Sequence, residues 1–145
     1  MLQTTPVSHS SWRVRRVGDR LVELVLTPPL CLADVAATVA AIGIEIRRIA
    51  PTPVVFAADI RTLLVMPPDV AEQFLAMLRA NSPAVERTAV LIAADRGVMA
   101  LQVERLIHSG GHATRRTFDT PREAVAWLHQ VTPDAMLLGP RWGTN

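Results

Sequence analysis

The chain has 145 residues, of which 50% are hydrophobic and 19% are charged, and its formal net charge is only +2. This length and composition favour one domain with its own hydrophobic core and exclude a chain that is disordered throughout. The nearly balanced charge gives no support for nucleic acid as a partner, because such binding gains from a basic surface with interleaved aromatic side chains.

The amino-acid usage also excludes several kinds of site. All 15 basic residues are arginine, so chemistry that needs a P-loop lysine or a Schiff-base lysine is unavailable. Cys31 is the only cysteine, which rules out a disulfide within the chain. We expect it to be a small buried side chain.

The apolar segments are too short to predict a membrane span. The longest weakly interrupted one, residues 30–44, contains Asp34 and falls short of the ~20 residues that a helix needs to cross a bilayer. Residues 1–16 lack the apolar segment of a signal peptide. These features predict a cytoplasmic protein.

The first half of the chain predicts a hairpin, a helix and a buried strand. Residues 12–26 alternate on both sides of Gly18 and Asp19, as two strands joined by a tight turn do. Four apolar side chains then recur at helical spacing: Val35, Val39, Ile42 and Ile46. After the breaker at residues 51–53, the apolar run 54–58 is typical of a central strand covered on both faces.

The second half predicts three more helices that alternate with two strands. Asp69 and Glu72 form a candidate capping box before an apolar stripe, and residues 89–93 read as a buried strand. A third helix around Met99 and Val103 should end at Gly110, and residues 114–118 read as the last strand. The final helix has an N-cap at Thr120 and a proline at its first position. The pair at 132–133 could start a short helical turn before a polar tail.

The resulting order is β-β-α-β-α-β-α-β-α, which predicts an α/β fold: a single domain with a mixed β-sheet flanked by helices. The alternation of strands and helices implies a parallel sheet in its later part, with right-handed crossovers. We expect a flexible N-terminal segment over 1–11, the domain over 12–131 and a C-terminal tail over 132–145.

Three segments in this order resemble the STAS domain of bacterial anti-sigma factor antagonists, and more closely the SpoIIAA-like single-domain proteins related to STAS and CRAL-TRIO domains. They are the strand end from Phe56 to Arg61, the strand from Arg87 to Ile92, and the segment from Phe118 to Leu128. The resemblance covers roughly residues 12 to 130. It implies a bacterial signalling fold that acts by binding protein partners.

In the antagonist family, a serine near the start of the second helix is phosphorylated by a partner kinase. When Asp59 is taken as the strand-end aspartate of the family, that serine falls at Pro68 and its preceding aspartate at Pro67. Neither proline can be phosphorylated. The resemblance therefore implies a partner-binding corner formed by Arg61, Thr62, Pro67, Pro68 and Asp69, without the phosphorylation switch.

Three predicted strand ends carry an aspartate: Asp59, Asp95 and Asp119. Ligands gather beyond the carboxyl ends of strands in open α/β sheets, so these side chains are a candidate ligand cluster. The alternative is that each aspartate caps a turn or a helix. His108 and His112 have the spacing of helical metal ligands, but Gly110 and Gly111 should break the helix between them. We therefore predict no metal site and no cofactor.

The first hairpin carries Arg13, Arg15, Arg16 and Arg20. These could form a docking surface for an acidic protein, or they could protect an edge strand from pairing with another chain. Trp127 could pack the last helix onto the sheet or line a ligand cavity.

The sequence contains no catalytic constellation, so we expect a non-enzymatic protein. The first hypothesis is a regulatory module that binds a protein partner of unknown identity. The second is a carrier of a small apolar ligand or lipid, which the CRAL-TRIO relationship and the hydrophobic composition suggest.

Overall fold

The structure is a computed structural model, and it describes residues 7–9, 11–110 and 114–144. The strands are β1 (Val7–His9), β2 (Trp12–Val17), β3 (Leu21–Leu26), β4 (Val54–Asp59), β5 (Val85–Leu91) and β6 (Thr114–Phe118). The α-helices are α1 (Leu32–Ile49), α2 (Pro68–Asn81), α3 (Gly97–Ser109) and α4 (Pro121–His129). Three short 3-10 helices are η1 (Ser82–Ala84), η2 (Pro133–Leu137) and η3 (Pro140–Trp142).

The strands form one mixed sheet in the order β1-β2-β3-β4-β5-β6. The first three are antiparallel neighbours, and β3 to β6 run parallel. The mixed α/β sheet and the predicted order of strands and helices are therefore confirmed. The structure adds β1, which lies within the segment over 1–11 that we expected to be flexible.

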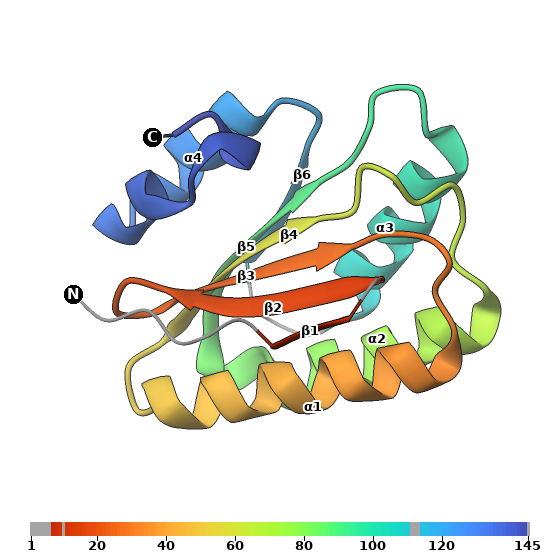
Figure 1. Ribbon diagram of the computed structural model, residues 1–145, viewed down its shortest axis with the longest axis horizontal. Coiled ribbons are helices and arrows are strands. Elements are labelled where there is room, and N and C mark those ends of the chain that lie inside the picture. The colour runs from red at the N-terminus through yellow and green to blue at the C-terminus, as the bar shows by residue number, and fades with distance from the viewer. Residues whose placement is uncertain (1–6, 10, 111–113, 145) are drawn as a thin grey trace.

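The helices cover the two faces of the sheet unequally (Figure 1). The first three helices follow successive parallel strands, and right-handed crossovers place such helices on one face. A core on that face joins Val35 and Ile42 of α1 to Phe74 of α2 and Val103 of α3. On the other face, α4 and the C-terminal 3-10 helices cover the sheet, as the core residues Leu128 and Trp142 show.

The turn and cap residues explain where several elements begin and end. Gly18 has φ of 67° in the turn between β2 and β3, a conformation that glycine adopts without strain. The side chain of Thr120 accepts a hydrogen bond from the backbone N–H of Glu123, which confirms the predicted N-cap of α4. The capping box predicted at Asp69 is absent, because α2 begins at Pro68 and places Asp69 inside the first turn.

The segment over 132–145, which we expected to be a polar tail with a short turn, differs from that description. The turn is present as η2, but the segment also buries Ala135, Leu138 and Trp142 against the sheet. These three apolar side chains are spaced as on one face of a helix, but Gly139 and Pro140 interrupt the segment before Trp142, so the pattern did not predict their burial.

Two smaller expectations also differ. Strand β5 begins at Val85, four residues before the apolar run at 89–93, because β4 pairs with Val85 and both β4 and β6 pair with the polar residues Arg87 and Thr88. Cys31 is exposed instead of buried, since it precedes the first residue of α1 and its Sγ lies 3.2 Å from Asp34 Oδ2.

Candidate functional site

The corner between β4 and α2 is anchored at both ends, and we call residues 61–69 the corner segment. At its start, Asp59 is buried and accepts hydrogen bonds from Arg61 Nη2 at 2.9 Å and from Arg141 Nη1 at 3.1 Å. Burial by itself would raise the pKa of Asp59, but the hydrogen bonds from Arg61 and Arg141 outweigh it and hold the pKa below its ordinary value. Asp59 is therefore an ionised anchor for the corner.

The other end of the corner segment is held by α3. The side-chain amide of Gln102 accepts from the backbone N–H of Met66 at 2.8 Å and donates to the Met66 carbonyl at 2.7 Å. Leu63 and Met66 point into the core and are almost fully buried. The corner segment is thus pinned by apolar side chains and by a paired amide.

Four large apolar side chains remain exposed around this corner, and we call them the corner patch. Leu64 is 61% exposed and Val65 is 55% exposed, both on the corner segment. Val98 is 58% exposed and Leu101 is 67% exposed, both on the first turns of α3. The bonds between Gln102 and Met66 hold the two parts together, because Gln102 follows Leu101 directly and Met66 follows Val65.

The five residues predicted to bind a partner lie on this corner but play different parts. Arg61 is half-buried by its contacts with Asp59, while Thr62, Pro67, Pro68 and Asp69 are exposed. Pro68 is the first residue of α2, and Asp69 Oδ1 accepts from the backbone N–H of Val70. The sequence did not single out the corner patch; the signal was the unbroken apolar run from 63 to 66 inside a turn.

The predicted cluster of Asp59, Asp95 and Asp119 does not form a metal site. Asp59 is enclosed by its two arginines, whereas Asp95 and Asp119 are exposed. Within the described residues, no group of His, Cys, Asp and Glu side chains could hold a metal ion. His112 lies outside the described residues, so the spacing of His108 and His112 is not tested.

The first hairpin does not carry its arginines on an edge strand, and three of the four bind acidic side chains. Strand β2 pairs with β1 and β3, and Arg13 and Arg15 both bind the buried carboxylate of Glu23 on β3. Arg20 binds Glu86 at 2.7 Å. The sequence could not show these ion pairs. Glu23 lies in an otherwise apolar strand, and the register between β2 and β3 decides which arginines lie beside it.

The aromatic side chains likewise support packing. Trp12 is buried, so it offers no stacking surface to a nucleic acid. Trp127 contacts Phe118, with the ring centroids 5.5 Å apart, and lies under the guanidinium of Arg87. It therefore packs α4 onto the sheet, on the face opposite to α2 and α3, and lines no cavity there that the described residues show.

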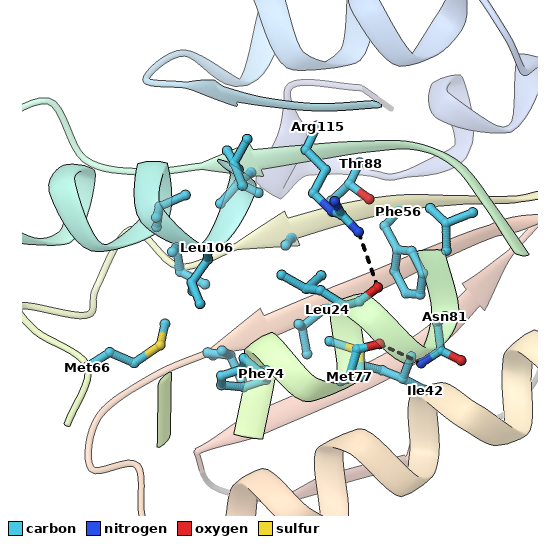
Figure 2. Close-up of a pocket in the computed structure, with 18 residues that line it drawn as sticks. Leu24, Ile42, Phe56, Met66, Phe74, Met77, Asn81, Thr88, Leu106 and Arg115 are labelled. Atoms are coloured by element: carbon cyan, nitrogen blue, oxygen red, sulfur yellow. Dashed lines mark hydrogen bonds between the residues drawn. The ribbon is translucent and has the colours of Figure 1, made fainter. Parts of the chain in front are cut away.

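An apolar cavity of about 90 Å³ lies between the sheet and helices α2 and α3 (Figure 2). It is lined mainly by aliphatic and aromatic side chains from β3, β4, α2 and α3. They include Leu24, Phe56, Met66, Phe74 and Leu106. The cavity was not predicted, because helical and strand patterns place side chains on a face but do not show whether they fill it.

The polar residues of this cavity gather at one end. Thr88 and Arg115 are direct neighbours across β5 and β6, and Asn81 is the last residue of α2. Met66, which precedes α2, lies at the opposite end (Figure 2). Arg115 Nη2 donates to the carbonyls of Leu78 and Gly110, and burial lowers the pKa of Arg115 from its ordinary value.

Comparison with solved structures identifies the fold. An uncharacterised protein from Shewanella loihica PV-4, of the DUF3478 family and described as having a SpoIIAA-like fold, superposes with a TM-score of 0.59 at 18% identity. The match covers 81% of this chain and 92% of that one. The chain has a SpoIIAA-like fold. This confirms the resemblance drawn from the strand ends and the final helix.

Other comparisons add no function to the SpoIIAA-like fold. No known protein family matches the sequence, and no curated protein is similar to it. Among the described residues, no helix is both long and apolar enough to cross a bilayer.

Proposed function

We propose that this protein is a cytoplasmic, non-catalytic regulatory module that binds a protein partner through the corner segment and the start of α2. The corner patch carries the proposal. Apolar side chains that are individually exposed are common, but four that are gathered on one corner support an interaction surface. This corner is also where the resemblance to anti-sigma factor antagonists puts partner contact.

The anchoring of the corner supports binding without a large rearrangement. The bonds of Asp59 and of Gln102 fix both ends of the segment that carries Leu64 and Val65. Two consecutive prolines, Pro67 and Pro68, further restrict its backbone. A surface that is ordered before binding loses less conformational entropy when a partner covers it.

The proline at position 68 also sets how such a module would be regulated. Pro68 has no hydroxyl group, so phosphorylation at the position of the antagonist serine cannot control binding. We propose that binding depends on the apolar corner patch and is controlled by the concentration of the partner. The non-catalytic reading is supported by Asp59, whose carboxylate is occupied by Arg61 and Arg141.

Affinity purification from the source cell with matched baits tests this function. Wild-type protein and Ile44→Asp, a charge placed on the exposed side of α1, should capture the same partner in stoichiometric amount. Leu64→Asp in the corner patch and Asp69→Arg at the start of α2 should lose it. If all four baits retain the same proteins, or none retains a partner above background, the corner is not the docking surface. Size-exclusion chromatography of each bait separates this outcome from self-association.

A second function is favoured by the cavity. We infer that the protein could carry a small apolar ligand, since a cavity lined by aliphatic side chains stays dry and can bind an apolar molecule. Native mass spectrometry of protein purified without organic solvent tests this inference. A retained small-molecule mass would support it, and a bare polypeptide mass that also fails to bind added short-chain amphiphiles would exclude it.

A further inference from the structure

We propose that the apolar cavity is an effector site for a small uncharged apolar molecule, and that filling it holds the corner segment closed against α3. This inference rests on the ligand-carrier function proposed above: it names the class of ligand and adds a regulatory consequence for the same cavity. The surface that responds is the corner patch, since Leu64 and Val65 lie on the corner segment and Val98 and Leu101 lie on α3.

The surface of the cavity selects against charge. It is almost entirely apolar, although polar residues border one end. Polar atoms at that end bond to backbone carbonyls: Asn81 Nδ2 donates to Met77 at 3.0 Å, and Arg115 Nη2 donates to Gly110 at 3.1 Å. A charged group that entered the cavity would give up its hydrogen bonds to water and gain little in exchange. The ligand is therefore uncharged, and the part of it that enters the cavity is apolar.

The volume of the cavity limits the size of the ligand. At about 90 Å³, the cavity is smaller than the engineered cavity of about 150 Å³ that binds benzene or xenon. A hydrocarbon with three carbon atoms is therefore a suitable probe. An apolar cavity of this kind stays dry, so the probe displaces no ordered water when it binds.

The wall of the cavity is shared with the corner segment. Ile60, directly before this segment, and Met66 within it both line the cavity. Gln102 of α3 binds the backbone N–H and the backbone carbonyl of Met66, and we call these two bonds the clamp. Val103, the next residue of α3, lines the cavity as well. The clamp thus holds together two parts of the cavity wall.

A separation of the corner segment from α3 breaks the clamp and opens the cavity, because the same movement parts Met66 from Val103. The ligand therefore binds the closed state more tightly than the open one, and this difference in affinity shifts the equilibrium toward the closed state. Opening here needs less free energy than unfolding the domain, since α2 and α3 each fully bury two residues, whereas α1 buries seven. A filled cavity thus keeps the two halves of the corner patch together.

Cyclopropane and propanoate test the class of ligand, because both contain three carbon atoms and only propanoate is charged. Methyl-labelled wild-type protein is titrated with each, and the methyl NMR signals of Leu24, Leu106 and Ile107 report on the cavity. Cyclopropane should shift these signals in a saturable way, whereas propanoate should leave them unchanged at the same concentrations. The titration also gives the Kd of cyclopropane.

Hydrogen exchange at the Met66 amide tests the regulatory consequence. A ligand that binds only the closed state slows exchange by one plus the ratio of its free concentration to Kd, which is about twofold at half saturation. The control is the Asp134 amide in η2, on the other face of the sheet, which donates to Thr132 Oγ1 at 3.2 Å. Its exchange rate should not change. Equal slowing at both amides would overturn the proposal, because the ligand would then stabilise the whole fold and not the corner.

Two variants separate the cavity from the clamp. Ala58→Val adds carbon atoms to a small residue of the cavity lining, so it should lose cyclopropane binding and, with it, the effect of cyclopropane on Met66. Gln102→Leu removes the clamp, so it should keep cyclopropane binding while exchange at Met66 becomes fast and insensitive to the ligand. Circular dichroism and thermal unfolding check that each variant is folded.

Each result decides a separate question. If cyclopropane leaves the cavity signals of the wild-type protein unchanged, the effector site fails, and the ligand-carrier function fails with it if hexan-1-ol also leaves them unchanged. If propanoate binds as tightly as cyclopropane, the uncharged class of ligand is overturned. If cyclopropane fills the cavity but the Met66 amide exchanges at the same rate, the carrier function stands and the regulatory link is overturned. A slowing at Met66 that survives in folded Gln102→Leu would likewise overturn the role of the clamp.

Discussion

The indole Nε1 of Trp142 donates a 2.7 Å hydrogen bond to Glu23 Oε2, and this bond ties the end of the chain to the centre of the sheet. Both groups are almost fully buried. The other carboxylate oxygen of Glu23 accepts from Arg13 at 3.0 Å and from Arg15 at 2.6 Å. A charge in the core is tolerated only when it is paired and hydrogen-bonded, so the C-terminal segment helps to satisfy Glu23.

Trp142→Phe should therefore lower the free energy of unfolding more than its lost ring area implies. The variant keeps an aromatic side chain but leaves Glu23 Oε2 without its buried donor, which costs about 1–3 kcal/mol. Urea denaturation measures the change. Trp127→Phe is the control: its ring packs against Phe118 on the same face of the sheet, and Glu23 is untouched. Equal losses in the two variants would show that the bond to Glu23 contributes nothing.

The sequence predicted the elements whose signal is local. Residues 54–58 are apolar at every position because both faces of β4 are covered, and Thr120 marks the start of α4 because its side chain reaches the N–H of Glu123. Such patterns depend on neighbours a few residues away. They correctly gave five of the strands and all four α-helices.

The sequence could not predict the contacts made between distant segments. Glu23 meets Trp142 across 119 positions, and Gln102 meets Met66 across 36. No spacing rule links such residues, since their proximity follows from the order of strands and the path of the loops. For the same reason, the corner was predicted from the resemblance, whereas the exposed apolar side chains of α3 that complete its patch were not.

The C-terminal segment offers a direct test, because two adjacent leucines lie in opposite environments. Leu138 is 2% exposed and Leu137 is 38% exposed. Leu138→Ala should lower the free energy of unfolding by about 2–5 kcal/mol, since it leaves a cavity beneath the sheet. Leu137→Ala should change it by no more than about 0.5 kcal/mol. If the segment were a polar tail, as the sequence suggested, thermal unfolding would not distinguish the two variants.

The turn between β2 and β3 should be intolerant of any side chain. Gly18 has a positive φ, and a Cβ built there would lie 2.2 Å from Asp134 Oδ1. Asp134 Oδ2 accepts from the backbone N–H groups of Asp19 and Arg20, so it cannot move away without losing both bonds. Gly18→Ala should therefore lower stability by at least about 1–3 kcal/mol.

The comparison variant for that turn is Gly97→Ala. A Cβ at Gly97 meets no atom within 4 Å, and the residue lies at the first position of α3. Alanine there should be neutral or stabilising by up to about 1 kcal/mol, because it restricts the unfolded chain. Chemical denaturation of both variants checks the contrast. Equal tolerance of alanine at the two positions would contradict the close approach of Asp134 to the turn.

The anchor at Asp59 predicts how stability depends on pH. Its pKa in the folded protein lies below the ordinary value: burial opposes ionisation, but the hydrogen bonds from Arg61 and Arg141 outweigh it. The unfolded chain therefore binds the proton more readily than the folded one. The stabilisation by Asp59 is complete above the unfolded pKa of about 4 and is lost as the pH falls through the folded pKa.

Asp59→Asn should consequently cost the most stability near neutral pH, about 1–2 kcal/mol, because its arginine partners are partly exposed to solvent. The difference in unfolding free energy between the variant and wild type should shrink below about pH 4, where Asp59 of the unfolded wild-type chain begins to take up a proton. Urea denaturation at a series of pH values measures both curves. The control is Asp119→Asn, which changes an exposed aspartate and should leave the free energy of unfolding close to that of wild type. A difference for Asp59→Asn that widened on acidification would mean that the carboxylate does not hold the corner, because protonation would then add stability instead of removing it.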